Sequence, residues 1–539
     1  MKTFAVLYTL LTFLFADTLQ AHYLTPPADR SMSFSSDVAI NNKPSENQRN
    51  VRSASAFNGW LYVAYTINDT SNKRGGIYVG FSKDHGLTWA KFVTYVFNNS
   101  FYSMTDIAVA GTDTSNLDVY LAGVNQNTAG TSSTLYVDKF DGRNGTLTAG
   151  QIFVHPLGSR TVTDISLASD YLYPMAGASP YSIALLYTTH GASKDSLFFA
   201  LSGNGGKSFA KTQTLSATNE CFRKITLGYG KSASVSGSYY AAWELMGTSS
   251  SKLGHIFTAH SGTGAAWSPG ICLDSLSLKT LNLVCHPSIA CQYSNINNDS
   301  SGLTCLIAFE TAAGGNLKDM NVIGCYNKRA SSGNTWNAFS VAATSENDMQ
   351  PNVSYDQGES SFLITYYDST DGHLPFATKD LNMAAPNAWN FITTQYNDQS
   401  ENLKSPSPRI LLNPTLHMAS FVWISDNANL NGSVLFDSQY AGIATQVQTN
   451  SEAENNIAAA YPNPASDRIT IPISLSKSMD VNVTVYDMLG NEVNPMEIIH
   501  SAAGASNAIL EVNRFCAGVY FCRVQAGTMN RTLRFVVSR

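Results

Sequence analysis

A repeated pattern of short β-strands constrains the fold of this chain more than any other feature. Each repeat opens with polar residues or a proline, continues as a β-branched strand, turns, and returns as a strongly apolar strand. Seven copies of this strand pair lie at 51–55 with 61–65, 107–110 with 119–123, 165–168 with 183–187, 225–229 with 240–245, 289–292 with 304–309, 353–356 with 362–367 and 410–412 with 419–424. A single β-sandwich needs far fewer strands, so the pattern indicates a repeat architecture.

Each strand pair is followed by a third strand and, after a turn, by a fourth. Four antiparallel strands repeated around an axis form a β-propeller. We therefore predict an all-β protein whose main body is a seven-bladed β-propeller, with six or eight blades left open where a repeat is split or merged. The segment 32–39 precedes the first repeat, and we expect it to supply the strand that closes the ring.

The composition agrees with many short strands joined by polar turns. Charged residues make up only 13% of the chain and aromatic residues 11%, a mixture that suits long helices poorly. The net charge of −6 argues against nucleic acid as a partner, because nucleic-acid binding needs a basic surface.

The beginning of the chain has the features of a signal peptide. Lys2 supplies a positive start, Ala5 to Ala16 form an apolar run, and Ala21 offers a small residue for cleavage. We expect residues 1–21 to be removed during export. The run is too short to span a bilayer and no other segment is long enough, so we expect no transmembrane segment in the mature chain.

The order of these features divides the chain into parts. We expect the propeller at residues 30–445, a polar, alanine-rich linker at 446–460, and a small Ig-like β-sandwich at 461–539.

One turn between third and fourth strands carries a family signal. The segment 82–89 fits the pattern S-x-D-x-G-x-T-W, and the segment 202–209 is a weaker second copy. This pattern resembles the Asp-box, or BNR repeat, of sialidase-like propellers. The resemblance implies that its residues stabilise the turn and take no part in catalysis: Ser82, Asp84, Gly86, Thr88 and Trp89 in the first copy, and Ser202, Asn204, Gly206 and Phe209 in the second.

The tail carries several ordered motifs. Tyr461-Pro-Asn-Pro464 opens it, Val485-Tyr-Asp487 lies in the middle, and Gly518-Val-Tyr520 precedes a basic last strand. Together they resemble the type A sorting domain of type IX secretion. The resemblance implies a Bacteroidetes-type bacterium, Sec export to the periplasm, the type IX machinery as a partner, and a secreted or cell-surface location. The alternative is an accessory Ig-like module that binds carbohydrate.

Propeller geometry predicts where a ligand would bind. The loops that enter the innermost strands and leave the second strands lie on one face, so their polar residues should surround the mouth of the central channel. We expect the ligand-binding candidates there to be Arg49, Arg223, Lys224, Arg409, His286 and Asp368, and the weaker catalytic candidates to be Asp106, Asp164, Glu244, Glu310 and Tyr366.

Three functions fit these residues. The first is a noncatalytic module that binds extracellular glycans or proteins at this face. The second is a glycoside hydrolase, because exo-sialidases resembling this fold bind the substrate carboxylate with three arginines and use a tyrosine nucleophile beside a glutamate. The F-R-I-P motif of that family is missing; the nearest segment is Gln48-Arg49-Asn50-Val51. The third is a structural component of a surface layer.

Other chemistry finds little support in the sequence. The sequence contains no nucleotide-binding motif, no nucleophile-elbow motif of hydrolases and no zinc-protease motif. We therefore expect no cofactor and no metal site. The eight cysteines do not follow a zinc-finger spacing. In an exported protein they can form disulfides, and buried free thiols are the alternative.

Overall fold

The structure analysed is a computed structural model of the whole chain. It describes residues 34, 37–41, 46–69, 74–98, 100–111, 116–127, 133–156, 160–170, 181–191, 194–209, 212–218, 220–232, 237–246, 254–274, 283–293, 303–312, 320–329, 336–342, 346–356, 360–380, 389–393, 395–398, 401–413, 418–426, 431–439, 456–457, 460–461, 463–475, 478–488, 490–501, 504–526 and 529–538. The predicted signal peptide and most of the predicted linker lie outside these residues.

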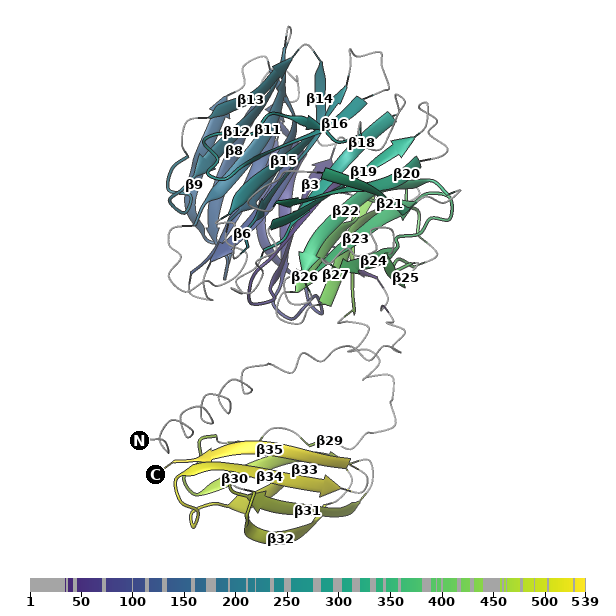
Figure 1. The fold of residues 1–539 in the computed structure, drawn as a ribbon. Helices are drawn as coiled ribbons and strands as arrows, with labels where there is room; N and C mark the ends of the chain where they lie inside the picture. Colours follow the sequence, from purple (N-terminus) through teal and green to yellow (C-terminus); the bar gives the residue numbers. More distant parts are fainter. Residues whose placement is uncertain are drawn as a thin grey trace, which may run out of the picture. The chain divides into compact units, whose positions relative to one another are not determined.

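The chain forms two compact units, residues 1–443 and 444–539. Figure 1 shows the first as a body of many β-sheets coloured purple to green, and the second as a smaller body of yellow strands. Among the described residues, no helix has the length and apolar character needed to cross a membrane.

The first unit contains seven four-stranded antiparallel sheets. We number these blades in chain order. Blades 1 to 6 each use four consecutive strands: β2 (Asn47–Ser55), β3 (Leu61–Asp69), β4 (Arg74–Ser82), β5 (Ala90–Asn98); β6 (Ser100–Gly111), β7 (Leu117–Asn127), β8 (Ser133–Asp141), β9 (Leu147–Pro156); β10 (Thr161–Ser169), β11 (Ile183–His190), β12 (Asp195–Ser202), β13 (Gln213–Thr218); β14 (Cys221–Gly230), β15 (Ser238–Met246), β16 (Gly254–Ser261), β17 (Ile271–Cys272); β18 (Leu283–Cys291), β19 (Leu303–Ala312), β20 (Met320–Arg329), β21 (Trp336–Ala342); β22 (Asp348–Asp356), β23 (Ser361–Asp368), β24 (Phe376–Asp380), β25 (Asn390–Thr393).

Blade 7 joins the two ends of the propeller. Its inner strands are β26 (Arg409–Asn413), β27 (Met418–Asp426) and β28 (Gly432–Ser438), and its outer strand is β1 (Val38–Ala39). β1 pairs with β28, with Val38 opposite Phe436. The first strand of the propeller therefore completes its last blade, within the segment predicted to close the ring. The prediction of an all-β, seven-bladed propeller is confirmed.

The hydrophobic core lies between neighbouring blades. The second strands have few polar residues because both of their faces are covered; every residue of β19 is buried. One cluster joins Val63 and Tyr65 of blade 1 to Val422 and Phe436 of blade 7, and each of the other six blade boundaries has its own cluster. These contacts bury the apolar faces of successive sheets and hold the ring closed.

The turn at 82–89 is held by its own side chains. The Ser82 hydroxyl accepts the Gly86 N–H at 2.8 Å, and Asp84 accepts the Thr88 N–H at 2.9 Å. Burial by itself would raise the pKa of Asp84, but the hydrogen bonds from Thr88 and Ser82 outweigh it and lower that pKa. The Trp89 ring packs edge-on against Phe436 of blade 7, with ring centroids 5.0 Å apart. The turn thus links two blades.

The turn at 202–209 repeats this arrangement. Asn204 accepts the Ser208 N–H at 3.0 Å, and the Ser202 hydroxyl accepts the Gly206 N–H at 3.0 Å. Phe209 packs edge-on against Phe153 of the preceding blade, at 5.3 Å. An amide oxygen here replaces the carboxylate oxygen that accepts the backbone N–H in the first turn. The side-chain bond is reversed: the Asn204 amide donates to the Ser208 hydroxyl at 2.8 Å, whereas Asp84 accepts from the Thr88 hydroxyl.

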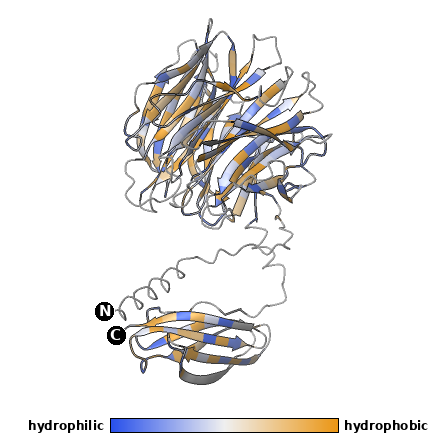
Figure 2. Cartoon of the chain, viewed as in Figure 1, coloured by the Kyte–Doolittle hydropathy of each residue, from blue (hydrophilic) through white to orange (hydrophobic). Residues whose placement is uncertain are grey.

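The second unit is a two-sheet β-sandwich. One sheet contains β29 (Asn456–Ile457), β30 (Arg468–Leu475) and β33 (Gly504–Glu511), and the other contains β31 (Met479–Tyr486), β32 (Glu492–Ser501), β34 (Gly518–Ala526) and β35 (Met529–Val537). Figure 2 shows hydrophobic and hydrophilic residues alternating along its strands. The inward-facing residues, among them Ile471, Val483 and Phe535, form its core.

Candidate functional site

The candidate site lies on the face of the propeller where the inner strands begin and the second strands end. We call this the channel face. At the start of the inner strand, the pairing shifts register between Arg49 and Arg52, between Cys285 and Ser288, and between Met349 and Asn352. Such shifts are β-bulges, which redirect side chains at strand ends.

The bulges place individual residues in unusual conformations. Asn50 has a φ of 53° and His286 a φ of 51°, values in the left-handed region that ordinary residues occupy rarely. The side-chain amide of Asn50 donates to the backbone oxygen of Ser103 in blade 2, at 2.6 Å. The bulge at Asn50 therefore turns a polar side chain toward the neighbouring blade.

Asp106 and Asp164, two of the predicted catalytic carboxylates, connect successive blades. Asp106 accepts the N–H of Leu167 in blade 3 at 2.6 Å, and Asp164 accepts the N–H of Ile225 in blade 4 at 3.0 Å. The other oxygen of each accepts the N–H of the residue that follows it in the chain. Both carboxylates are buried, and both oxygens of each accept a backbone N–H. This geometry indicates that they stabilise the contact between blades.

The same connection recurs in later blades with neutral side chains. The Ser288 hydroxyl accepts the Val353 N–H at 3.1 Å, and Asn352 accepts the Ile410 N–H at 2.8 Å. The equivalent positions in blades 4 and 7 are Lys224 and Arg409, which have no acceptor atom in their side chains. These two cations therefore cannot make the connection that Asp106, Asp164, Ser288 and Asn352 make.

Arg52 is the charged residue that sequence reasoning missed. Its guanidinium lies 3.7 Å from Asp106 and 3.8 Å from Asp164, and both Arg52 and Arg409 line the central channel. Only the residues just before the inner strands were aligned as candidates, and Arg52 lies beyond that position, inside the strand. Arg52 could have been found in the sequence as a charged residue within an inner strand, whose side chains face the channel.

Arg409 lies where the sequence placed it, at the channel mouth. Burial, followed by the positive charge of Arg52, lowers the pKa of Arg409 to about 9, while Asp106 and Asp164 act in the opposite direction. Two guanidinium groups from blades 7 and 1 therefore share one poorly hydrated mouth. The channel below them has a volume of about 380 Å³.

Arg49 is held apart from this pair. Its guanidinium contacts the Asp426 carboxylate of blade 7 at 2.5 Å and also donates to the backbone oxygen of Gln48. The arginines among the predicted ligand-binding residues, and so the candidates for a three-arginine site, are Arg49, Arg223 and Arg409. Arg49 is engaged in an ion pair between blades 1 and 7 instead.

A second charged group surrounds the boundary of blades 4 and 5. Burial raises the pKa of Glu244 to about 7, against the opposing effect of Arg223, the His286 N–H and Lys224. Burial also lowers the pKa of His286 to about 3, helped by Lys224 and Arg409. His286 Nδ1 contacts the carboxylate of Glu310. The structure thus brings together five of the predicted residues.

Tyr366 and Asp368 belong to blade 6. The Tyr366 side chain packs in the hydrophobic cluster between blades 5 and 6, and burial, followed by the charge of Asp348, raises its pKa. Asp368 is buried and accepts the Thr370 N–H at 2.9 Å within its own loop. These contacts give both residues a packing or turn-forming environment.

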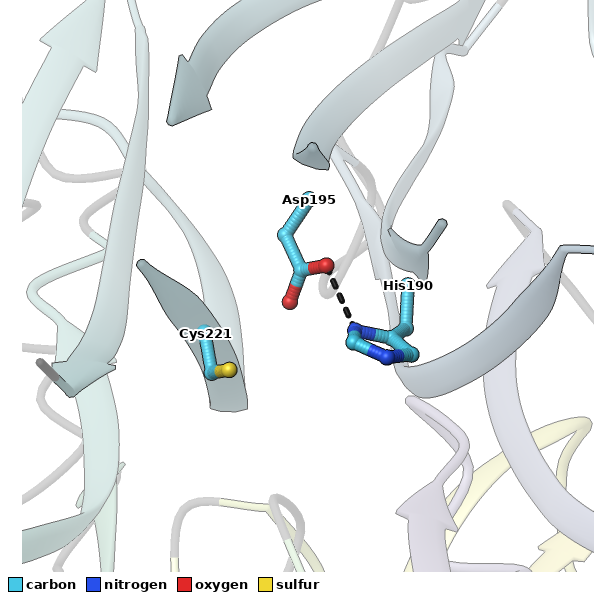
Figure 3. Close-up of side chains that lie close together, drawn as sticks. All are labelled: His190, Asp195 and Cys221. Carbon is cyan, nitrogen blue, oxygen red and sulfur yellow. Dashed lines mark hydrogen bonds and ion pairs between the residues drawn. The ribbon is translucent and has the colours of Figure 1, made fainter. Parts of the chain in front are cut away.

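The channel face also carries His, Cys and carboxylate side chains in close groups. Figure 3 shows one of them at the boundary of blades 3 and 4, where His190 Nδ1 lies 2.6 Å from Asp195 and Cys221 approaches from the next blade. His255 with Cys272 and Asp274, and Cys285 with His286 and Glu310, form similar groups. The sequence predicts no metal site, whereas the structure brings the possible ligand atoms of each of these groups within 4.8 Å of one another.

Comparison with known proteins identifies the second unit. Residues 459–538 match the family described as "Secretion system C-terminal sorting domain". The C-terminal unit is a sorting domain. It indicates export by type IX secretion to the cell surface or the extracellular space, as the tail motifs predicted. No curated protein matches the chain.

Solved structures similar to the chain include several propellers. An α-L-arabinofuranosidase from Fusarium graminearum is 11% identical, with 75% of this chain and 98% of that chain covered and a TM-score of 0.41. A Trypanosoma rangeli sialidase is 10% identical, with coverage of 93% and 87% and a TM-score of 0.37. A protein of unknown function from Dyadobacter fermentans is 12% identical, with coverage of 62% and 94% and a TM-score of 0.38.

Proposed function

We propose that the propeller is an exported binding module that recognises acidic groups of extracellular glycan or protein ligands at its channel face. One observation carries the proposal: Arg52 and Arg409 both line the channel mouth, and the positive charge of Arg52 adds to burial in lowering the pKa of Arg409. An anion bound between them would relieve this repulsion. A carboxylate suits the site because guanidinium groups donate to it in pairs.

Two carboxylates lie beside this positive charge. Asp106 and Asp164 form ion pairs with Arg52 at 3.7 and 3.8 Å, while their hydrogen bonds go to backbone N–H groups. Burial raises the pKa of Glu244 to about 7, so its carboxylate compensates Arg223 and Lys224 less than an ordinary glutamate would. An acidic ligand therefore meets several cations at one face.

A glycan array that includes uronic and sialic acids, together with acidic peptides, tests this proposal on the purified protein. We expect binding to acidic members, and loss of that binding in Arg409→Gln. Lys91→Gln on the exposed outer strand β5 is the control and should bind as the wild type does. Equal binding by wild type and Arg409→Gln would contradict the proposal.

Glycoside hydrolysis is the second candidate, and the environment of Glu244 favours it. A glycosidase needs one carboxylic acid that stays protonated near neutral pH and one ionised partner. The raised pKa of Glu244 favours the first role, and Glu310 on the adjacent blade, which contacts His286, is the candidate for the second. A panel of fluorogenic glycosides would show turnover that Glu244→Gln abolishes; the absence of turnover across the panel would leave the binding function alone.

A further inference from the structure

Two buried thiols face each other in blade 5. Cys291 ends the inner strand β18, and Cys305 lies directly opposite it on β19. Their Sγ atoms are 3.2 Å apart, and both residues are buried. Among the strand pairs that the structure describes, no other cysteine has a cysteine as its direct partner in the register.

The backbone around this pair has the geometry that a disulfide requires. The Gln292 N–H donates to the Thr304 oxygen at 2.8 Å, so the preceding pair, Cys291 and Cys305, occupies a non-hydrogen-bonded position. The Cα atoms at such positions are about 4.5 Å apart, which falls within the range of about 4.4 to 6.8 Å found in disulfides. Small side-chain rotations would join the sulfurs without moving the strands.

We propose that Cys291 and Cys305 form a cross-strand disulfide in the exported protein. The two thiols lose two protons and two electrons, and a disulfide-bonded oxidoreductase outside the cytoplasm is reduced to its dithiol in exchange. The bond forms before blade 5 packs against its neighbours, because the folded propeller encloses both sulfurs. It then ties together the strands that carry His286 and Glu310 at the channel face.

Peptide mapping of the secreted full-length protein tests this proposal. Free thiols are alkylated in denaturant without reductant, and chymotrypsin then cuts after Tyr293, between the two cysteines. We expect peptides containing Cys291 and Cys305 to remain joined until a reductant is added. Cys285→Ser is the control, because Cys285 lies near Cys291 in the sequence and the link should persist without it. Alkylation of Cys291 and Cys305, or a link to another cysteine, would overturn the proposal.

A separate group in blade 4 has the donor atoms of a metal site. His255 is the second residue of strand β16, Cys272 lies on the paired strand β17, and Asp274 lies two residues after Cys272. Cys272 Sγ lies 3.8 Å from His255 Nδ1 and 3.3 Å from Asp274 Oδ1, and His255 Nδ1 lies 2.8 Å from Asp274 Oδ2. Ligand atoms around a tetrahedral zinc ion are about 3.5 Å apart, given metal–ligand distances of about 2.0 to 2.3 Å.

The surroundings favour coordination by these three residues. The Ile256 N–H donates to Asp274 at 2.8 Å and so orients the carboxylate, as second-shell groups do in zinc proteins. His255 is partly exposed, which leaves room for an ion to enter and for a water molecule as fourth ligand. We infer that His255, Cys272 and Asp274 bind a divalent transition-metal ion of the zinc type.

Cobalt(II) titration of the metal-free full-length protein tests this second inference. We expect a thiolate-to-cobalt absorption band that Cys272→Ser abolishes and His255→Asn weakens at least tenfold in affinity. His260→Asn is the matched control, because His260 lies on the same strand and in none of these groups. The inference fails if no thiolate band appears, if Cys272→Ser retains it, or if Cys272 is found in a disulfide.

Discussion

The carboxylate of Asp106 accepts the backbone N–H of Leu167 across a blade boundary, at 2.6 Å. A residue that sequence patterns made a candidate acid is thus part of the framework that joins two blades. Asp164, Ser288 and Asn352 make the same connection elsewhere in the ring. Because the same connection recurs, we assign these four polar residues to the contacts between blades. The other polar residues of the channel face are the candidates for ligand binding.

Replacing Asp106 should reduce stability strongly. Asp106→Ala removes the acceptor of two buried N–H groups and the charge near Arg52, and we expect a loss of about 2 to 4 kcal/mol in the free energy of unfolding. Asp106→Asn keeps one acceptor oxygen, as Asn352 does, and should cost about half as much. Urea unfolding of the three proteins provides the measurement, and equal stabilities would refute the framework role.

Gly86 should tolerate no side chain. Its φ is +94°, and an added Cβ would lie 2.0 Å from the Phe436 ring. We expect Gly86→Ala to cost about 2 to 4 kcal/mol, through backbone strain and overpacking together. Gly372→Ala is the matched control: its φ is +75° with open space around the Cβ, so it should cost about 1 to 2 kcal/mol. Thermal unfolding compares them, and equal losses would exclude the steric contribution.

Stability should fall as the pH rises because Glu244 is protonated more readily in the folded state. Its pKa rises from 4.5 to about 7, so between these values the folded protein binds more protons than the unfolded chain. The stabilisation is complete below pH 4.5 and is lost as the pH approaches 7, with a total of about 3 kcal/mol.

Comparison with Glu244→Gln isolates this contribution. Burial also raises the pKa values of Asp37 and Glu401, to about 7 and about 8. The pH dependence of stability in the wild type alone would therefore combine the contributions of all three carboxyl groups. We expect the wild type to lose more stability than Glu244→Gln between pH 5 and pH 8 in urea unfolding. If the free energy of unfolding depends on pH in the same way in both proteins, Glu244 does not make this contribution.

Periodicity in the sequence was sufficient to predict the architecture. Alternating strands with apolar second strands, such as β19, indicate blades because each sheet is covered on both faces. The motifs of the tail likewise indicated the sorting domain. Both features depend on residues close together in the sequence, so they can be recognised from the sequence alone.

The site could be predicted only in part. The positions of Asp106 and Arg409 at the channel mouth followed from alignment of the repeats. Arg52 was missed because a β-bulge changes which residues reach the channel, and a bulge leaves no clear mark in the sequence. The ion pair of Arg49 with Asp426 was not predicted, because ring closure brings blades 1 and 7 together without showing which of their side chains meet.

Calorimetric titration of the protein with an acidic ligand selected from the array tests whether Arg52 and Arg409 bind that ligand. We expect Arg409→Gln and Arg52→Gln each to weaken binding at least tenfold, while Arg49→Gln, whose guanidinium contacts Asp426 at 2.5 Å, should bind within about threefold of the wild type. Unchanged affinity in Arg409→Gln and Arg52→Gln, with both proteins folded, would contradict this expectation.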